Sequence, residues 1–589
     1  MPLNVATRSA SAASIAALAG AGVPPLLARI YAARGVTSLQ ELATDFSSLA
    51  PLARMHNVER MAAILADAIA ARQRLLIVAD YDSDGATACA VGMRALREFG
   101  AVVDYLVPNR FEYGYGLTPE IVDLAKTLKN PDILITVDNG IASVDGVATA
   151  NRLGMRVLIT DHHLPGATLP DALCIINPNQ PGCGFPSKHL AGVGVMFYLM
   201  LALRAELRKR GAFSKAHGTE SEAKEGVPAS RLPLPASRRD AEPNLAALLD
   251  LVALGTVADV VKLDANNRIL VQQGLQRIRA GKTWPGIAML MKVAGRSLAR
   301  ASTYDLGFVL GPRLNAAGRL DDMAVGIECL ISNDPTTAER IARALDTLNR
   351  ERRSIESGMH DNALAILGEL PPHDGYSLCL FDPGWHQGVI GILASRIKER
   401  LHRPVIAFAR GNDGELKGSG RSIGALHLRD ALDLVAKREP GLLLKFGGHA
   451  AAAGLTLRAA DLARFRDAFE ATAQALLSPA DLARIIETDG ALPREHLTLE
   501  SARLFEQQVW GQGFPPPLFD DEFSVVQQRV VADRHLKLRL ARDGGEYEAM
   551  LFSHATPLPR RVQAVYRLTV NEYNGAQRLQ LTIEHWQEA

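Results

Sequence analysis

Residues 75–85 read Leu-Leu-Ile-Val-Ala-Asp-Tyr-Asp-Ser-Asp-Gly, a short apolar run that stops in three acids spaced two apart. Helix-forming residues follow at 86–90, so the pattern predicts a buried parallel strand, a loop and a helix. Asp80, Asp82 and Asp84 then lie at the carboxyl end of the strand. No basic residue in the loop offsets their repulsion, which favours a bound Mg²⁺ or Mn²⁺ ion with oxygen ligands. The alternative is an acidic helix N-terminus with solvated neighbours.

Alternating strands and helices continue after this loop. Strands are predicted at 75–79, 102–107, 133–137 and 157–160, and helices at 86–99, 118–128 and 144–153. Strands separated by helices of this length form right-handed crossovers in one parallel sheet. Asp138-Asn139-Gly140 follows the third strand and Asp161-His162-His163 follows the fourth. Both segments therefore join the first acidic loop at the carboxyl edge of the sheet, where α/β proteins bind their ligands.

The whole chain sets broader limits. Its 589 residues are enough for three or four domains. The net charge is +1, from 65 basic and 64 acidic residues, so any nucleic-acid surface must be local. The five cysteines form no CxxC pair, which argues against a disulfide framework or zinc finger and favours a reducing cytoplasm. No stretch reaches the ~20 apolar residues of a membrane span.

Helical segments flank the first sheet. Apolar spacing predicts helix from about 23 to 71, and a helix over 245–254 is followed by Gly255-Thr256-Val257-Ala258-Asp259. Asp259 is a further candidate ligand, although a lone Asp after a helix is more often a cap. Residues 211–243 are rich in Lys, Glu, Ser, Ala and Pro and predict a mobile surface insertion. Further helices follow Asp259, with the segment 311–319 between them. The amphipathic stretch 335–367 is long enough to connect two domains.

A second α/β unit begins near Tyr376, with strands predicted at 378–381 and 405–409. Glycine-rich segments follow at 384–391, 418–422 and 447–454, and they contain Arg421, Ser422 and His449. Glycines beside helix starts expose backbone N–H groups that can hold a phosphate. The alternative for each segment is ordinary turn chemistry.

The C-terminal region is rich in strands. Residues 535–540 alternate strictly, turn signals stand at 543–545 and 574–575, and residues 579–583 alternate again. About five short strands predict a small barrel. Lys537 and Arg539 would face outward and suit a single-strand groove, although a solvated face is the commoner meaning of such residues.

Taken together and in order, four motifs resemble those of the DHH phosphoesterase superfamily. They are Asp80-Tyr81-Asp82-Ser83-Asp84-Gly85, Asp138-Asn139-Gly140, Asp161-His162-His163 and Gly255-Thr256-Val257-Ala258-Asp259. Within the superfamily the chain is similar to the bacterial single-strand-specific 5′-to-3′ exonucleases. This narrower similarity rests on segments 108–117, 311–319, 384–391, 447–454 and 510–514, and it runs from about Val23 to the C-terminus.

The resemblance implies a domain order. An N-terminal helical segment (1–72) precedes an α/β catalytic domain with a parallel sheet (73–335, with the insertion at 211–243). A connecting helix (336–367), a smaller α/β DHH-associated domain (368–460) and a linker with an oligonucleotide-binding (OB) fold barrel (461–589) follow.

The resemblance also implies two divalent ions, Mn²⁺ or Mg²⁺, and a set of site residues. The expected metal ligands are Asp80, Asp82, Asp84, Asp138, His162 and Asp259. Asp138 would bridge the ions, and His163 would face the scissile phosphate. Asp161 would orient a histidine from behind the ligands.

Substrate contacts are expected from other residues. Arg110 is the candidate for the 5′-phosphate, because a guanidinium fork matches phosphate geometry. Further candidates are Arg313, Asn315 and Arg319 near the 5′ end and Arg421, Ser422 and His449 for the following phosphates.

The expected function is single-stranded-DNA-specific 5′-to-3′ exonuclease activity that releases 5′-mononucleotides. The resemblance further implies work in DNA repair and recombination beside a single-strand-binding protein and a RecQ-type helicase. Two rivals remain. One is a phosphodiesterase of very short oligonucleotides or other small substrates, and the other is a non-catalytic single-strand binder.

Overall fold

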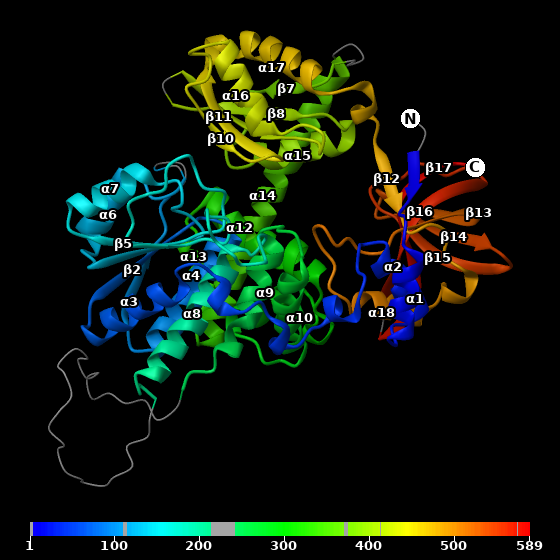
Figure 1. Ribbon diagram of the computed structural model, residues 1–589. Coiled ribbons are helices and arrows are strands. Elements are labelled where there is room, and N and C mark those ends of the chain that lie inside the picture. The colour runs from blue at the N-terminus through cyan, green and yellow to red at the C-terminus, as the bar shows by residue number, and fades with distance from the viewer. Residues whose placement is uncertain are drawn as a thin grey trace, which may run out of the picture. The chain divides into compact units, whose positions relative to one another are not determined.

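The chain forms two compact units (Figure 1). The computed structural model describes residues 4–109, 113, 115–213, 242–369, 375–412, 414–573 and 575–589. The sheet unit comprises Ser9–Leu348 and Thr498–Pro517, and the barrel unit comprises Met1–Arg8, Asn349–Leu497 and Leu518–Ala589. Most of the predicted insertion at 211–243 lies outside the described residues. Within the described ranges, every helix is too short or too polar to cross a bilayer.

A five-stranded parallel sheet is the centre of the sheet unit. The strands are β2 (Arg74–Ala79), β3 (Val102–Leu106), β4 (Ile133–Val137), β5 (Arg156–Thr160) and β6 (Cys174–Ile176). Their order is β3-β2-β4-β5-β6, and each neighbouring pair is parallel. The predicted parallel sheet is confirmed. The sequence pattern does not reveal β6, because three residues are too few to show a period.

Helices cover both faces of this sheet (Figure 1). On one face, α6 (Pro119–Leu128) and α7 (Val144–Arg152) share a buried cluster with Leu76 and Val78 of β2. The other face carries α3 (Val58–Ala70), α4 (Ser83–Glu98) and α8 (Gly192–Lys209). Alternate residues of a strand point to opposite faces, so the unbroken apolar run of β2 is what burial on both sides requires.

Most of the remaining helices of the unit follow α8 in the chain. They are η4 (Leu245–Leu248), α9 (Leu249–Ala258), α10 (Ala265–Arg279), α11 (Pro285–Val293), η5 (Leu298–Arg300), the π-helical η6 (Asp305–Leu310), α12 (Gly311–Leu320), α13 (Ala324–Ile331) and, later, α18 (Leu499–Glu506). Two expectations need correction here. The helix predicted to stop at Leu254 continues to Ala258, and the segment 311–319, expected between helices, is itself α12.

Glycines caused both errors, because they mark close packing rather than helix ends. A Cβ at Gly255 would lie 2.1 Å from Thr87 Oγ1. A Cβ at Gly318 would lie 2.0 Å from the carbonyl oxygen of Tyr81. Both contacts bring a helix against the acidic loop or the helix that follows it.

The N-terminal segment is helical only at its two ends. It contains α1 (Ala12–Gly20), α2 (Pro25–Ala32) and α3, with three 3₁₀ turns between the last two, η1 (Leu39–Leu42), η2 (Phe46–Ser48) and η3 (Leu52–Arg54). The α-helical structure predicted from about 23 to 71 is therefore wrong in the middle of this stretch. Gly35, at φ 81°, ends the first helical stretch.

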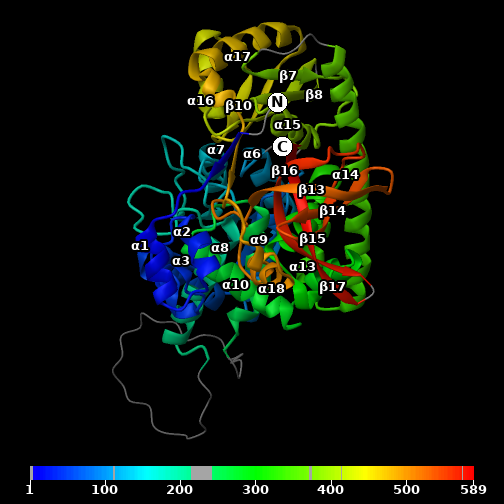
Figure 2. The same ribbon diagram turned by 90° about the vertical axis from the view of Figure 1, so that its right-hand side faces the viewer.

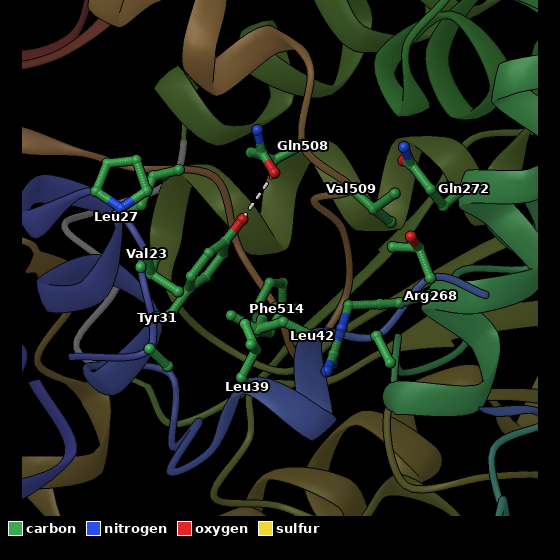
Figure 3. Close-up of a pocket in the computed structure, with 15 residues that line it drawn as sticks. Val23, Leu27, Tyr31, Leu39, Leu42, Arg268, Gln272, Gln508, Val509 and Phe514 are labelled. Atoms are coloured by element: carbon green, nitrogen blue, oxygen red, sulfur yellow. Dashed lines mark hydrogen bonds between the residues drawn. The ribbon is translucent and has the colours of Figure 1, made fainter. Parts of the chain in front are cut away.

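The segment 510–514 is held to α2 by aromatic stacking. Trp510 and Phe514 stack with ring centroids 5.5 Å apart, and Tyr31 lies 5.7 Å from Trp510. The Tyr31 hydroxyl donates to Gln508 Oε1 at 2.8 Å, beside a pocket of about 320 Å³ (Figure 3). None of the acids of residues 80–84 lines this pocket. The segment therefore fastens Thr498–Pro517 to the sheet unit.

The long helix α14 (Pro335–Glu369) leads from the sheet unit into the barrel unit, and Figure 2 shows its length. A second sheet of order β10-β11-β9-β8-β7 follows. Its strands are β7 (Leu378–Phe381), β8 (Val405–Arg410), β9 (Glu415–Arg421), β10 (Lys445–Gly448) and β11 (Ala452–Arg458), with helices α15 (Ile390–Leu401), α16 (Leu428–Arg438), η7 (Ala459–Asp461) and α17 (Leu462–Leu476).

Two glycine-rich segments predicted as loops are largely strands. Residues 418–421 belong to β9, and most of 447–454 belongs to β10 and β11. The physical reason is again packing. A Cβ at Gly418 would lie 2.6 Å from the Phe408 ring, and one at Gly420 would lie 2.7 Å from Leu428.

The C-terminal strands close into a barrel of order β13-β14-β15-β17-β16 (Figure 2). They are β13 (Phe519–Val531), β14 (His535–Arg542), β15 (Gly545–Leu551), β16 (Arg561–Tyr573) and β17 (Ala576–Glu588). The linker before them contains η8 (Pro479–Leu482), β12 (Ile485–Thr488) and η9 (Arg494–His496), and β1 (Asn4–Thr7) pairs with β12 in parallel. The predicted five-stranded barrel is confirmed, whereas the sequence pattern does not reveal the β1–β12 pair.

A buried polar group inside the barrel gives a test of its stability. Asp521 Oδ2 accepts a hydrogen bond from Tyr566 Oη at 2.6 Å and forms an ion pair with Arg542 Nη1 at 2.6 Å. Tyr566→Phe leaves this carboxylate with one donor fewer, so we expect the free energy of unfolding to fall by about 1–2 kcal/mol. Urea denaturation followed by circular dichroism measures the change. Tyr547→Phe in β15 is the matched control, because the Tyr547 hydroxyl makes no hydrogen bond with the described residues. An equal loss in both variants would contradict the assignment.

Candidate metal centre

Carboxylates from several elements converge at the carboxyl edge of the parallel sheet. Asp80 and Asp82 follow β2, and Asp84 lies in the first turn of α4. Asp138 follows β4, and Asp259 follows α9. Asp80, Asp84 and Asp138 are less than a tenth exposed. The sequence-predicted ligands are thus brought together from positions up to 179 residues apart in the chain (80 to 259).

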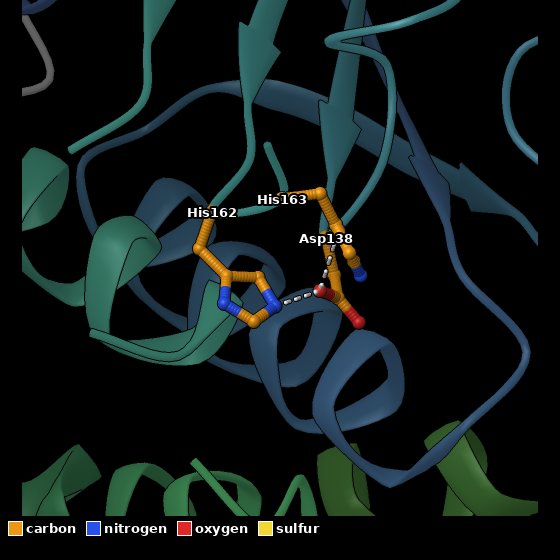
Figure 4. A group of neighbouring side chains, drawn as sticks. All are labelled: Asp138, His162 and His163. Atoms are coloured by element: carbon orange, nitrogen blue, oxygen red, sulfur yellow. Dashed lines mark ion pairs between the residues drawn. The ribbon is translucent and has the colours of Figure 1, made fainter. Parts of the chain in front are cut away.

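His162 is the point at which three of these acids meet. Its Nε2 lies 3.1 Å from Asp138 Oδ1, 3.5 Å from Asp259 Oδ2 and 3.9 Å from Asp84 Oδ2. Asp138 Oδ1 and Asp259 Oδ2 are buried and accept no hydrogen bond from the described residues. Both His162 and His163 are directed at the Asp138 carboxylate (Figure 4). Buried oxygens left without donors, beside an imidazole nitrogen, are a donor set that fits a divalent cation.

The donor atoms form three groups whose members lie within 4.8 Å of one another. The groups are Asp80–Asp82–Asp138, Asp84–His162–Asp259 and Asp138–His162–His163. Asp138 is shared by the first and third groups, and His162 by the second and third. The first two groups are linked through the third, which shares Asp138 with one and His162 with the other. This arrangement is compatible with two neighbouring ions and with Asp138 between them.

Charge repulsion in this cluster is severe. Burial, with the charge of Asp82, raises the pKa of Asp84 to about 7. Burial and the charge of Asp84 raise the pKa of Asp138 and of Asp259 well above their usual range. Without added positive charge, ionisation of these carboxyls is therefore disfavoured. A divalent cation would replace the protons and let the acids ionise together.

The N-terminus of α8 supplies part of the missing positive charge. Asp84 Oδ2 accepts from the Gly192 amide at 2.6 Å, and Oδ1 accepts from the Val193 amide at 2.9 Å. The amino end of an 18-residue helix thus points at a buried carboxylate. Asp82 in turn caps α4, because its Oδ1 accepts from the amides of Asp84 and Gly85. The backbone therefore fixes the direction of both ligands.

Asp161 lies behind the cluster and orients His163. Its Oδ1 lies 2.8 Å from His163 Nδ1, and its Oδ2 accepts from the Ile141 amide at 2.9 Å. Burial disfavours a charged imidazole, but the hydrogen bond and charge of Asp161 outweigh burial and raise the pKa of His163 to about 9. The pair is therefore a carboxylate and an imidazolium near neutral pH.

Two contributors to this site escape analysis of the sequence. The Gly192 and Val193 amides act through the backbone, and the glycine before the long α8 pattern is the signal that could have pointed to them. Tyr115 is the second contributor. Its hydroxyl donates to the Asp138 carbonyl at 3.2 Å and lies 3.2 Å from His163 Nδ1. It stands in the Gly-Tyr-Gly stretch at 114–116.

One of the seven predicted substrate residues lies outside the described residues, three lie in the sheet unit and three lie in the barrel unit. Arg110 lies outside the described residues. Arg313 is buried, and its guanidinium bonds to Asp346 at 2.8 Å and to the Val309 carbonyl at 2.7 Å, so it holds α12 to α14 here. Asn315 Oδ1 accepts from the Ser83 amide at 2.8 Å and so supports the acidic loop. Arg319, in the last turn of α12, is partly exposed.

The other three predicted residues lie in the barrel unit. Arg421 ends β9 opposite Ala452 of β11, and the Ser422 amide donates to the Ala451 carbonyl. His449 occupies the β10–β11 turn, where its amide donates to the Ala452 carbonyl. Arg421, Ser422 and His449 are thus brought together at one end of the second sheet.

Comparison with known proteins places these observations in a class. Residues 74–222 match the DHH family, N-terminal domain, residues 374–475 match the DHHA1 domain, and residues 488–585 match the RecJ OB domain. These matches, with the acidic cluster at the edge of a parallel sheet, define a DHH phosphoesterase with a C-terminal OB fold, as the sequence predicts.

Individual relatives narrow the class. The chain is 50% identical over 575 residues to the single-stranded-DNA-specific exonuclease RecJ of Dickeya dadantii and 49% identical over 577 residues to that of Escherichia coli, in each case covering 96% of both chains. It also superposes on RecJ of Thermus thermophilus in complex with Mn²⁺, with a TM-score of 0.79 and 28% identity, covering 100% of this chain and 79% of the other. A structure of RecJ from the same organism in complex with Mg²⁺ gives a TM-score of 0.73. The chain belongs to the RecJ family and is a nuclease.

A methyl group added at Gly192 tests the role of α8. Its Cβ would lie 2.8 Å from both Cβ and Oδ1 of Asp138. Gly192→Ala should therefore displace a ligand and lower nuclease activity by about 100-fold or more. It should also weaken Mn²⁺ binding measured by titration calorimetry. Gly194→Ala is the control, since its Cβ would meet only the Leu190 side chain; equal Mn²⁺ affinity in both variants would refute the role of α8.

Proposed function

We propose that this protein is a single-stranded-DNA-specific exonuclease that works from 5′ to 3′ and releases 5′-mononucleotides. The observation that carries the proposal is the meeting of Asp84, Asp138 and Asp259 at His162, with buried carboxylate oxygens that accept no hydrogen bond from the described residues. The RecJ relatives, named as single-stranded-DNA-specific exonucleases, support the choice of substrate.

The proposed ligands of two divalent ions, Mn²⁺ or Mg²⁺, are the expected set of five aspartates and one histidine. They are Asp80, Asp82, Asp84, Asp138, Asp259 and His162. When bound, such ions lower the pKa of a water molecule and hold a phosphate in line for attack. Asp138 is the proposed bridging ligand, since its carboxylate is shared by two of the three donor groups. The acids and His162 would hold the ions in place, and no side chain is needed as nucleophile.

His163 is proposed to face the scissile phosphate. Its ring is held by Asp161, its pKa is raised to about 9, and its side chain is 25% exposed against 11% for His162. A protonated imidazole at this position donates a charge-assisted hydrogen bond to a phosphate oxygen. Tyr115 limits the rotation of the same ring, because its hydroxyl lies 3.2 Å from His163 Nδ1.

The barrel favours a long strand over a small substrate. Small-substrate phosphodiesterases of the superfamily resemble only the two α/β domains, whereas this chain carries a third, β-rich domain. The two cations of β14 offer less positive charge to a nucleic-acid strand than the sequence suggests. Lys537 pairs with Glu548 at 3.2 Å and Arg539 with Glu546 at 3.6 Å. We propose that the affinity of the barrel for a single strand depends less on these two cations than on the exposed apolar side chains of the barrel. Among them are Val526, Val530 and Phe552.

A wider role in DNA repair and recombination is part of the proposal. The proposed partners are a single-strand-binding protein and a RecQ-type helicase. Membership of the RecJ family is the only support for these partners.

Asp138→Ala tests the metal centre. The substitution removes the carboxylate shared by two donor groups, so cleavage should fall by at least about 1,000-fold while strand binding persists. The assay follows a single-stranded oligonucleotide labelled at its 3′ end, with Mn²⁺ and beside its duplex form. The wild-type chain should shorten the single strand only, in a ladder toward short 3′ fragments. Normal turnover by the variant would refute the site, and consumption of di- to tetranucleotides alone would favour a small-substrate enzyme.

Arg110→Ala tests the proposed reading of the 5′ end. A guanidinium matched to the terminal phosphate should favour a phosphorylated end over a hydroxyl end. We expect the variant to lose at least about tenfold of this preference, measured as the ratio of initial rates on the two oligonucleotides. Arg72→Ala, at a surface arginine outside the predicted site, is the control. An equal loss on both substrates would assign Arg110 another role.

A further inference from the structure

Two exposed aromatic rings of the sheet unit, Tyr304 and Phe308, stack on each other. Tyr304 is 57% exposed and Phe308 is 67% exposed, and their ring centroids lie 5.2 Å apart with planes inclined by 24°. We call this pair the aromatic step. Single exposed apolar side chains are common on proteins, but a stacked pair that keeps most of both rings in water adds little to a core.

Packing connects the aromatic step to the last turn of α9. Phe308 lies in η6, where a Cβ at the preceding Gly307 would lie 3.2 Å from Val257. A Cβ at Gly311, just after η6, would lie 3.0 Å from Ala258 Cβ. Val257 and Ala258 are the last two residues of α9, directly before Asp259. The next residue, Val260, is 63% exposed and adds a third apolar side chain beside Asp259.

The backbone below the aromatic step is rigidly held. Asp305 is 1% exposed, and its Oδ1 accepts from Arg296 Nε at 2.5 Å. Its Oδ2 accepts from the Ser302 amide at 2.9 Å and from Ser302 Oγ at 2.8 Å. The segment is also π-helical, a local geometry that is frequent at functional sites. Rings mounted on a fixed turn lose little freedom when a flat partner stacks on them.

We propose that the aromatic step stacks bases of the substrate strand next to the scissile phosphate. This inference rests on the proposed function. The flat face of an aromatic ring stacks on the flat face of a nucleobase, and the strand whose phosphate enters the metal centre carries such bases. Stacking accepts any base, so the step would hold the strand without reading its sequence.

A cycle of variants and modified strands tests the proposal. All proteins carry Asp138→Ala to stop cleavage, and fluorescence anisotropy measures binding of a 12-nucleotide single strand with Mn²⁺. A second strand lacks the first four bases at its 5′ end but keeps its backbone. Phe308→Ala and Tyr304→Ala should each weaken binding of the intact strand by about tenfold. Neither substitution should weaken binding of the abasic strand, because that strand lacks the bases on which the rings would stack.

Two controls separate stacking from a structural effect. Phe308→Trp keeps a flat ring and should restore binding of the intact strand, whereas Phe308→Leu keeps bulk alone and should not. Phe46→Ala removes another exposed aromatic ring, in η2, and should leave both affinities unchanged.

The outcomes are distinct. Equal losses on the intact and abasic strands, or no loss on either, would overturn the aromatic step as a base platform. Failure of the chain with Asp138 intact to shorten a single strand would instead overturn the proposed function. If the chain with Asp138 intact shortens a single strand, but binding by the Asp138→Ala protein is unaffected by removal of the bases, only the aromatic step is refuted.

Discussion

Repulsion among buried carboxylates is the constraint on which the sheet unit depends. Asp84, Asp138 and Asp259 lie close enough to His162 that their charges cannot coexist without compensation. The chain supplies compensation in two forms, the amides at the start of α8 and the imidazolium held by Asp161. Both are incomplete, so the site retains a demand for positive charge that a divalent cation satisfies. The same unmet demand that makes the cluster unfavourable alone gives it affinity for metal.

Close helix packing holds these ligands together. Glycines at 192, 255 and 318 allow α8, α9 and α12 to approach the acidic loop or the residues beside it at distances that a Cβ would block. Asn315 adds hydrogen bonds from α12 to the Ser83 amide and hydroxyl. The strands of the sheet therefore determine where the acidic loops begin. Helices far along the chain determine the positions that the carboxylate groups take. Asp138 adopts φ 63°, a left-handed conformation that the surrounding packing must enforce.

The sequence predicts the parts of this protein that follow a strong period. Apolar runs locate β2, β4 and β5, and acids at their ends locate most of the candidate ligands. Glycine is where prediction fails, because the residue that ends a helix at one site permits tight packing at another, as at Gly255, Gly318 and Gly418. Contributions from the backbone, such as the Gly192 amide, carry no side-chain signal. The acids that pair with Lys537 and Arg539 lie on the neighbouring strand β15. The residue pattern of β14 alone therefore cannot predict these ion pairs.

The division of the chain between its units has a consequence for synthesis. The sheet unit includes Thr498–Pro517, and Trp510 and Phe514 pack there against Tyr31 of α2. During translation, α2 therefore lacks these aromatic partners until the ribosome has made some 480 further residues, from 31 to 510. The acidic cluster, by contrast, is complete in sequence once Asp259 has emerged. Helix α12, which packs against the acidic loop, follows by Leu320, so the ligands and their supports are all made long before Thr498–Pro517 is available to pack against α2.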